Sequence, residues 1–349
     1  MRVVVVGCGA VGAASALALA RAGHDVTVLE RFGPANAYGS SHGGARIFRC
    51  AYDEPDYTAL ALRAHAGWRQ IEAAAGVELL TTTGCVDHGD PAALAGVAAA
   101  ARVAGAASEP VSAGDAARRW PGLRFDGDAQ LDPLGGRLDA AAAVSAMAWL
   151  AVAAGARLVT ERAIEVDATG VTTGAGRHEA DAVVVAAGAW THGLVAGLPA
   201  PVITLEQPVH FAVTVPADWP SFIHHPAGDD PVIYGLLEPG AGLKVGEHGT
   251  GRVVDPDDLD RDPEPEGIER LRAYAARWLP GAQPASAVAT GCLYDTTANN
   301  NPVIDRLPDG VIAAAGTSGH GFKFAPELGA LVAGLVAGDA PHPRLAVPA

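Results

Sequence analysis

Lysine is almost absent from this 349-residue sequence, in which only Lys244 and Lys323 stand among 24 basic residues. Basic residues are also outnumbered by 39 acidic ones, and the formal net charge is -15. This balance argues against a nucleic acid or an anionic membrane as partner, because both require clustered basic surface. An ammonium is compact and loses its proton more readily on burial than a guanidinium does. The two lysines are therefore candidate functional residues, unless they persist by chance in an arginine-biased composition.

Cysteine and long apolar runs are equally scarce. The four cysteines, Cys8, Cys50, Cys85 and Cys292, lie far apart and show no CxxC or metal-ligand spacing, so neither disulfides nor a metal site is predicted. Free thiols suit a reducing compartment. No apolar run could span a bilayer without Gly, Arg or Asp, and the N-terminal run is too short for a signal peptide. We expect a globular, cytoplasmic protein.

The N-terminal segment has the order of a βαβ unit. A β-branched run, Val3–Val6, leads directly into the glycine-rich segment Gly7–Gly12. An alanine- and leucine-rich stretch then predicts a helix over Ala13–Ala22, and Asp25–Glu30 reads as a second strand. This order is typical of a dinucleotide-binding domain.

The glycines and the terminal acid of this unit match the needs of a dinucleotide. Gly7 would permit the tight turn, Gly9 would let a pyrophosphate approach the backbone, and Gly12 would let the helix pack on the strand. Glu30 stands where a carboxylate can accept hydrogen bonds from an adenosine ribose. The alternative is a glycine-rich turn in an ordinary α/β protein, and the motif does not distinguish NAD from FAD.

Later segments bear on the choice of cofactor. A helix predicted over Asp139–Ala154 precedes a strand at Ala156–Thr160, and a second buried strand is predicted at Asp181–Gly188. The nucleotide-binding sheet thus resumes after a long insertion. Such an interruption is more typical of flavin-binding folds than of NAD domains, which run through consecutive strands. It favours FAD, with an NAD-dependent dehydrogenase as the lesser alternative.

Two further segments combine glycine with positive charge. The loop Gly39–Arg49 holds His42, Arg46 and Arg49 among small residues, and like charges repel unless an anion or solvent compensates them. Near the C-terminus, a predicted strand over Gly310–Gly316 leads into the glycine turn that holds Lys323, and a helix is predicted to begin near Pro326. The positive end of that helix would face whatever the turn cradles.

Together these segments resemble the monomeric sarcosine oxidase and N-methyltryptophan oxidase family, FAD-dependent amine oxidases of the D-amino acid oxidase superfamily. The segments that carry the resemblance are Gly7–Gly12 with Glu30, Gly39–Arg49, Gly242–His248, Cys292–Tyr294 and Gly316–Phe324. It implies an α/β fold in which a glutathione-reductase-like, Rossmann-type FAD domain is interleaved with an α+β substrate domain built on an antiparallel sheet. We expect residues 1–80, 138–196 and 288–349 to form the FAD domain, and residues 81–137 and 197–287 the substrate domain.

The resemblance implies oxidation of a secondary or cyclic amino (imino) acid. A hydride would pass from the carbon next to nitrogen to flavin N5, leaving an imine, and O2 would be reduced to H2O2. By the same resemblance, Arg49 and Lys323 would hold the substrate carboxylate, while Lys244 would help oxygen react. His42 and Arg46 would tune the charge of the flavin. A monomer is implied.

The remaining site residues are also implied by the resemblance. Tyr234, His248 and Tyr294 would line the substrate pocket, and Cys292 would form a thioether with the flavin 8α-methyl group. The full set expected to hold FAD is Gly7, Gly9, Gly12, Glu30, Arg31, Ser40, His42, Arg46, Cys292, Gly316, Gly319, Gly321 and Lys323.

Several departures from the family pattern leave the substrate open. They are Asp295 with the polar stretch after it, Ala325-Pro326, and the Pro/Gly-rich segment Leu236–Gly240. Cyclic imino acids, larger N-methyl amino acids and a biosynthetic intermediate all stay possible, as do a flavin dehydrogenase that passes electrons to another protein and a flavin-binding subunit of a larger complex. The acidic stretch Asp255–Glu266 is expected to be a solvated loop.

Overall fold

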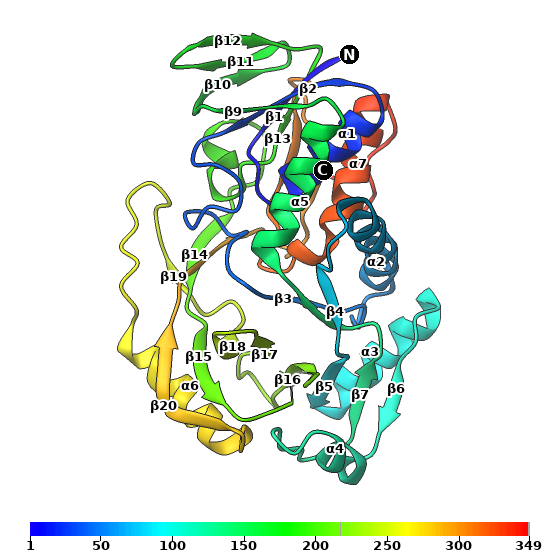
Figure 1. Cartoon of the computed structure of the whole chain (residues 1–349), viewed down its shortest axis with the longest axis vertical. Coiled ribbons are helices and arrows are strands. Elements are labelled where there is room, and N and C mark those ends of the chain that lie inside the picture. Colours follow the sequence, from blue (N-terminus) through cyan, green and yellow to red (C-terminus); the bar gives the residue numbers. More distant parts are fainter. Residues whose placement is uncertain (217, 348–349) are drawn as a thin grey trace.

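In the computed structural model, which describes residues 1–216 and 218–347, two large β-sheets lie at opposite ends of the molecule (Figure 1). The first sheet has six strands in the order β22-β23-β13-β1-β2-β9. Neighbouring strands are parallel, except that β22 is antiparallel to β23. Its strands are β1 (Arg2–Val6), β2 (Asp25–Glu30), β9 (Arg157–Thr160), β13 (Ala182–Val185), β22 (Val303–Arg306) and β23 (Ile312–Ala315).

Both faces of this sheet are covered. Val3 and Val5 of β1 pack into a core shared with the helices α1 (Ala10–Arg21), α2 (Pro55–Ala75), α5 (Ala140–Ala153) and α7 (Ala325–Ala337). Val4 and Val6 point to the other face, toward the small antiparallel sheet of β10 (Ala163–Asp167), β11 (Gly170–Thr173) and β12 (Gly176–Glu179). Burial on both faces explains why this strand is continuously apolar.

The second sheet has eight strands in the order β20-β15-β18-β17-β16-β5-β7-β6 and is antiparallel except between β16 and β5. The strands are β5 (Cys85–Gly89), β6 (Glu109–Val111), β7 (Ala129–Asp132), β15 (Val209–Val213), β16 (Ser221–His225), β17 (Ile233–Glu238), β18 (Gly242–Glu247) and β20 (Ala282–Ala289). The helices of this part are α3 (Pro91–Ala104), α4 (Ala113–Arg119) and α6 (Pro265–Trp278).

Two three-stranded sheets lie between the large ones (Figure 1). One consists of β14 (Val202–Glu206), β19 (Arg252–Val253) and β21 (Cys292–Thr296), and the other of β3 (Arg46–Phe48), β4 (Leu80–Thr82) and β8 (Gly136–Leu138). The chain also forms two short 3-10 helices, η1 (Gly188–Gly193) and η2 (Phe322–Phe324). Because β3 and β21 begin with Arg46 and Cys292, these small sheets place both residues at the centre of the molecule.

The fold class expected from the sequence is confirmed, and its interruption is visible in the strand order. β13 and β23, far along the chain, pair in parallel beside β1. The first helix starts at Ala10 rather than at Ala13, because the last residues of the glycine motif form its first turn. The helix expected after Asp139 is present as α5, and the Asp139 side chain caps it by accepting the Ala142 N–H. None of the helices in the described ranges combines the length and apolarity that crossing a bilayer requires.

Candidate active site

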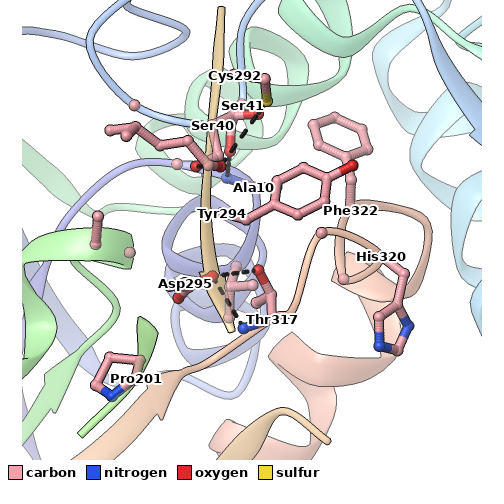
Figure 2. A pocket seen from close by; sticks show the side chains of 18 of the residues that line it. Ala10, Ser40, Ser41, Pro201, Cys292, Tyr294, Asp295, Thr317, His320 and Phe322 are labelled. Carbon is pink, nitrogen blue, oxygen red and sulfur yellow. Dashed lines mark hydrogen bonds between the residues drawn. The ribbon is translucent and has the colours of Figure 1, made fainter. Parts of the chain in front are cut away.

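A cavity of about 1320 Å³ runs from the carboxyl ends of β1 and β2 to the inner face of the eight-stranded sheet. Figure 2 shows part of it: Cys292 and Ser40 lie above the Tyr294 ring, Asp295 and Thr317 lie below it, and Phe322 lies beside it. Most sequence-predicted site residues line it: Gly7, Gly9, Glu30, Arg31, Ser40, Arg46, Arg49, Tyr234, Lys244, His248, Cys292, Tyr294, Gly319, Gly321 and Lys323. Gly12, His42 and Gly316 lie behind its walls, outside the residues that line it.

Gly7 and Gly12 of the glycine motif lie so close to neighbouring backbone atoms that a side chain would not fit. Gly7 has a φ of +96°, and a Cβ there would lie 2.4 Å from the Ala186 carbonyl oxygen. A Cβ on Gly12 would lie 2.1 Å from the carbonyl oxygen of Gly7, so only glycine lets α1 pack against this turn. Gly9 borders the cavity, and its nearest neighbour is the Ser41 side chain. The start of α1 is therefore open to a ligand with phosphate groups.

The end of β2 carries two charged residues at the same part of the cavity. The Glu30 carboxylate accepts hydrogen bonds from the backbone N–H groups of Cys8, at 2.7 Å, and Phe32, at 2.9 Å. Arg31 forms an ion pair with Asp257 at 2.9 Å. Asp257 belongs to the stretch expected to be a solvated loop, and it is exposed there. It also borders the cavity, where it pairs with Arg31 and accepts a hydrogen bond from Trp190 Nε1.

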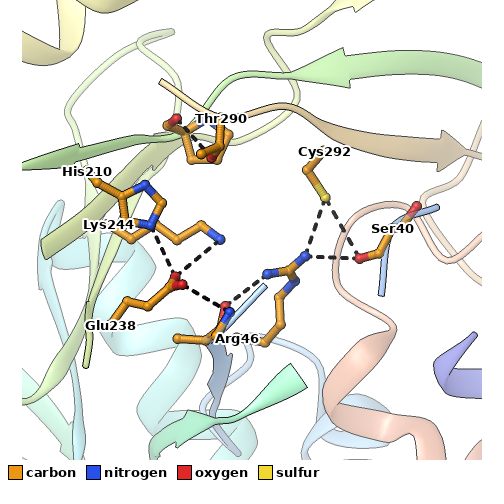
Figure 3. Close-up of polar contacts among 10 residues, drawn as sticks. Ser40, Arg46, His210, Glu238, Lys244, Thr290 and Cys292 are labelled. Carbon is orange, nitrogen blue, oxygen red and sulfur yellow. Dashed lines mark hydrogen bonds and ion pairs between the residues drawn. The ribbon is translucent and has the colours of Figure 1, made fainter. Parts of the chain in front are cut away.

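Arg46 connects the cationic loop to Cys292. Its guanidinium donates to the Ser40 carbonyl oxygen at 3.0 Å and lies 3.7 Å from Cys292 Sγ (Figure 3). The Ser40 hydroxyl in turn donates to the Leu293 carbonyl oxygen at 2.7 Å, which fastens the loop to β21. Cys292 is a free thiol at the cavity wall with a cation beside it.

Lys244 lies on β18 and is buried, yet its ammonium reaches the cavity. Glu238 Oε2 lies 3.9 Å from its Nζ, and the same carboxylate contacts His210 Nε2 at 3.1 Å (Figure 3). Burial and the charge of Arg46 lower the pKa of Lys244 to about 8, although Glu238 opposes this. The Lys244 ammonium therefore loses its proton at a pH closer to neutrality than an exposed lysine does.

Arg49 and Lys323 approach the same aromatic ring. The Arg49 guanidinium carbon lies 4.4 Å from the centroid of Tyr52, and Lys323 Nζ lies 5.6 Å from it. The Lys323 ammonium donates to the His320 carbonyl oxygen at 2.9 Å, and the Lys323 carbonyl accepts from Trp68 Nε1. Burial and the neighbouring Arg49 lower the pKa of Lys323 to about 7. Two cations that repel each other in this way favour an anion between them.

Sequence reasoning missed the acid that compensates Arg49. Asp87 on β5 is fully buried, and its Oδ1 lies 3.3 Å from Arg49 and 2.8 Å from His225 Nε2. His225 comes from β16, which pairs with β5, and it lines the cavity. No motif contains Asp87, and the pairing of β5 with β16 that brings it to His225 is not visible in the sequence. Glu238 and His210 were missed for the same reason.

The expected pocket residues His248, Tyr294 and Tyr234 are uncharged near pH 7 because burial disfavours their charged forms. His248 and Tyr294 face each other with ring centroids 5.6 Å apart. Burial, with Lys323 and Arg49 nearby, lowers the pKa of His248 to about 4, and burial with Arg46 and Lys244 nearby lowers that of His42 to about 4. Both imidazoles are therefore neutral near pH 7. The hydroxyl of Tyr234 is also buried, which raises its pKa.

The C-terminal glycine turn is held by Asp295. Its carboxylate accepts the N–H of Gly316 at 2.8 Å and both the N–H and hydroxyl of Thr317 (Figure 2). Gly319 has a φ of +72°, and a Cβ there would lie 2.0 Å from the Tyr294 ring. A Cβ on Gly321 would lie 2.5 Å from Thr317. The departure from the family pattern at Asp295 therefore has a structural use, since it fixes the turn that leads to Lys323.

These residues fit an FAD molecule. The glycine turn at the start of α1 suits the pyrophosphate, Glu30 stands at the end of β2, and the cavity continues without interruption to Arg46, Lys244 and Cys292. His42, near Arg46 but outside the cavity lining, has a buried Nε2 with no hydrogen-bond partner within the described part of the chain. An elongated cofactor with an anionic middle matches this arrangement.

Comparisons with known proteins agree with the site. Residues 2–335 match the model of a family described as FAD dependent oxidoreductase. The chain is 32% identical to monomeric sarcosine oxidase of Bacillus sp. (strain B-0618), over 95% of this chain and 91% of that protein. It is also 32% identical to N-methyl-L-tryptophan oxidase of Salmonella arizonae, over 95% and 93%.

Among solved structures, the open form of NikD, an unusual amino acid oxidase essential for nikkomycin biosynthesis, superposes with a TM-score of 0.84. The match covers 99% of this chain and 96% of that one, at 27% identity. The family match, the relatives that act on amines and amino acids, and the cavity lead to one conclusion. The chain belongs to the FAD-dependent oxidoreductase family and is an enzyme of the branch that contains the sarcosine and N-methyltryptophan oxidases.

Proposed function

We propose that this protein oxidises a secondary or cyclic amino acid to an imine and reduces O2 to H2O2. The observation that carries the proposal is the separation of two cationic positions in one cavity. Arg49 and Lys323 both lie close to Tyr52, while Lys244 lies with Arg46 and Cys292. One position suits the substrate carboxylate, and the other suits oxygen.

The substrate end selects an amino acid over a simple amine. Arg49 can offer a two-pronged guanidinium and Lys323 a point charge, which together suit a carboxylate. His248 and Tyr294 would form the wall beside it, and Tyr234 lies in the same cavity. The neutral His248 adds no further charge there. The substrate amine would react in its neutral form.

When bound, FAD would supply two-electron chemistry, namely acceptance of a hydride equivalent from the carbon next to nitrogen and reduction of O2. Cys292 would attach the cofactor through a thioether, and Arg46 and His42 would adjust the charge around it. The ammonium of Lys244 would stabilise the negative charge that develops on oxygen, an electrostatic effect worth roughly 3 kcal/mol per group. Two hydrogens leave the amine and two protons with two electrons reach O2, so the reaction balances.

We further propose that the protein acts as a monomer in the cytoplasm. All four cysteines are free and buried in the structure, which suits a reducing compartment. The division into an FAD domain (residues 1–80, 138–196 and 288–349) and a substrate domain is proposed on the same basis as the function. In support of this division, the six strands of the first large sheet fall within the FAD ranges, and those of the second fall within the substrate ranges except for the last two residues of β20.

The proposal is tested with a panel of amino and imino acids, including sarcosine, N-methyl amino acids, proline and pipecolate, assayed for peroxide with the purified yellow protein. We expect peroxide from at least one secondary or cyclic amino acid, and none from the same amine without its carboxylate. Flavin reduction without peroxide in the presence of O2 would instead identify a dehydrogenase. A protein whose flavin no acid on the panel reduces would contradict the proposal.

A further inference from the structure

Glu238 occupies an unusual position beside the buried Lys244. It is the last residue of β17, and its carboxylate is largely buried between β15, β18 and the cationic loop (Figure 3). Oε1 accepts the Gly44 N–H at 3.0 Å, while Oε2 contacts His210 Nε2 at 3.1 Å and lies 3.9 Å from Lys244 Nζ. The Glu238 carboxylate therefore contacts three separate segments: the loop at Gly44, β15 at His210 and β18 at Lys244.

The sequence around the acid makes this contact possible. His210 of β15 is the register partner of Lys244 of β18, so the imidazole and the ammonium lie side by side. A Cβ on Gly44 would lie 2.8 Å from Glu238 Oε1, so a larger residue at position 44 would make the carboxylate shift. The glycine-rich loop is thus adapted to Glu238 as well as to the cavity.

The charge on Lys244 depends on few groups. Those that face it are Arg46 of β3, His42 of the preceding loop, Cys292 of β21, His210 of β15 and Glu238 of β17. Arg46 disfavours the ammonium and His42 is neutral near pH 7, whereas Glu238 is held ionised. Although burial opposes its ionisation, the contacts with His210, Lys244 and Gly44 hold the pKa of Glu238 at about 2.

We propose that Glu238, held by His210 and the Gly44 amide, is a positioning residue that sets the charge of Lys244 and so controls the reaction with oxygen. The first half of this inference, that Glu238 sets the charge of Lys244, concerns the lysine alone. The second half, that this charge controls the reaction with oxygen, rests on the proposed function. Glu238 has two opposed effects. It keeps Lys244 protonated to higher pH, but its own negative charge weakens the positive potential that a developing oxygen anion would meet.

Because the chain has only two lysines, the first half can be measured directly. Holoprotein labelled with ¹³C-lysine should give two side-chain signals, and Lys244→Arg assigns them. In Glu238→Gln, the midpoint of the Lys244 titration should fall by about one pH unit or more, as expected when an opposite charge within 4 Å is removed. Glu247→Gln, on the same strand as Lys244 but paired with Arg270 of α6, should leave the Lys244 midpoint unchanged. An unchanged Lys244 midpoint in Glu238→Gln would overturn the inference.

A second variant, Gly44→Ala, tests the inference even if Glu238→Gln does not fold. Gly44→Ala retains the carboxylate but displaces it, because the added methyl would meet Glu238 Oε1. It should lower the Lys244 midpoint in the same direction and by less. A Gly44→Ala protein that titrates as wild type, with Glu238→Gln unfolded, would also reject the inference.

The second half predicts that two pH profiles cross. Flavin reoxidation by O2 in Glu238→Gln should be faster than in wild type at low pH, where Lys244 is charged in both, and slower above the wild-type midpoint. Loss of a merely structural contact would slow it at every pH. If the lysine midpoint falls and the oxygen profile does not change, Glu238 still sets the charge, and the proposed oxygen role of Lys244 is the part that fails.

Discussion

The Arg49 guanidinium, placed to receive a substrate carboxylate, is already paired with the fully buried carboxylate of Asp87 at 3.3 Å. Arg49 is also held by the Ala51 carbonyl oxygen, and Asp87 by His225. The acid therefore competes with the substrate for the charge of Arg49, while the backbone contact maintains the position of the side chain.

Asp87→Asn should separate these effects. Removing one partner of a buried ion pair leaves the other uncompensated and should lower the free energy of unfolding by about 3 kcal/mol. Carboxylate ligands should nevertheless bind more tightly, because Arg49 loses its internal competitor. Denaturation midpoints measure the stability, and titration with acetate measures carboxylate binding. Asp181→Asn, which removes an acid from an exposed ion pair, is the control. Weaker carboxylate binding at wild-type stability would contradict this account of the pair.

The affinity for carboxylates should depend on the charge of Lys323. Its pKa is lowered to about 7, so the ammonium is present below that pH and is lost as the pH rises through it. The dissociation constant of a simple carboxylate should therefore increase above pH 7. Lys323→Arg should flatten the profile, since guanidinium stays charged, and Lys323→Met should weaken binding at every pH. The flavin spectrum reports each titration, and a wild-type profile that is flat to pH 9 would argue against Lys323 as an anchor.

Cys292 should be the point of covalent attachment. Acid-precipitated wild-type protein should stay yellow, and Cys292→Ala should release its flavin into the supernatant. Cys8→Ala is the matched control, because Cys8 is also buried beside the cavity but belongs to the first glycine turn. Colour retained by the Cys292→Ala pellet would place the bond elsewhere, and colour lost by wild type would show that the cofactor is not covalently bound.

Replacement of Gly319 should be costly for two reasons, its positive φ and its contact with Tyr294. Its φ of +72° costs an L-residue about 1–2 kcal/mol, and an added Cβ would also collide with the Tyr294 ring. Gly76, at φ +69° with nothing within 4 Å of an added Cβ, carries only the first cost. Gly319→Ala should therefore destabilise the protein more than Gly76→Ala and reduce its flavin content. Equal losses in thermal unfolding would show that Tyr294 does not constrain the turn.

Local patterns predicted the nucleotide-binding end of the molecule well. The Gly7–Gly12 turn and the strand over Asp25–Glu30 depend on neighbours within one βαβ unit, and β2 has the expected bounds. The helix predicted over Asp139–Ala154 is present as α5, with Asp139 as its N-cap. In these segments the capping residues, glycines and apolar runs all indicate the same structure.

The charges that surround the site could not be predicted in this way. Asp87 and His225 are brought together only by the pairing of β5 with β16, and Glu238 meets His210 and Gly44 only after three distant segments assemble. No short spacing marks such contacts. The two retained lysines were a usable compositional signal, but nothing in the sequence distinguished Glu238, beside Lys244, from the other acids among 39 acidic residues.

The most direct test of the division of labour in the cavity is rapid-mixing kinetics of Lys244→Met and Lys323→Met, with reduction by substrate and reoxidation by O2 measured separately. Lys244→Met should slow reoxidation about a hundredfold or more and leave reduction nearly unchanged. Lys323→Met should raise the substrate concentration needed for half-maximal reduction and leave reoxidation intact. Reoxidation of Lys244→Met near the wild-type rate, or the same defect in both variants, would contradict the account.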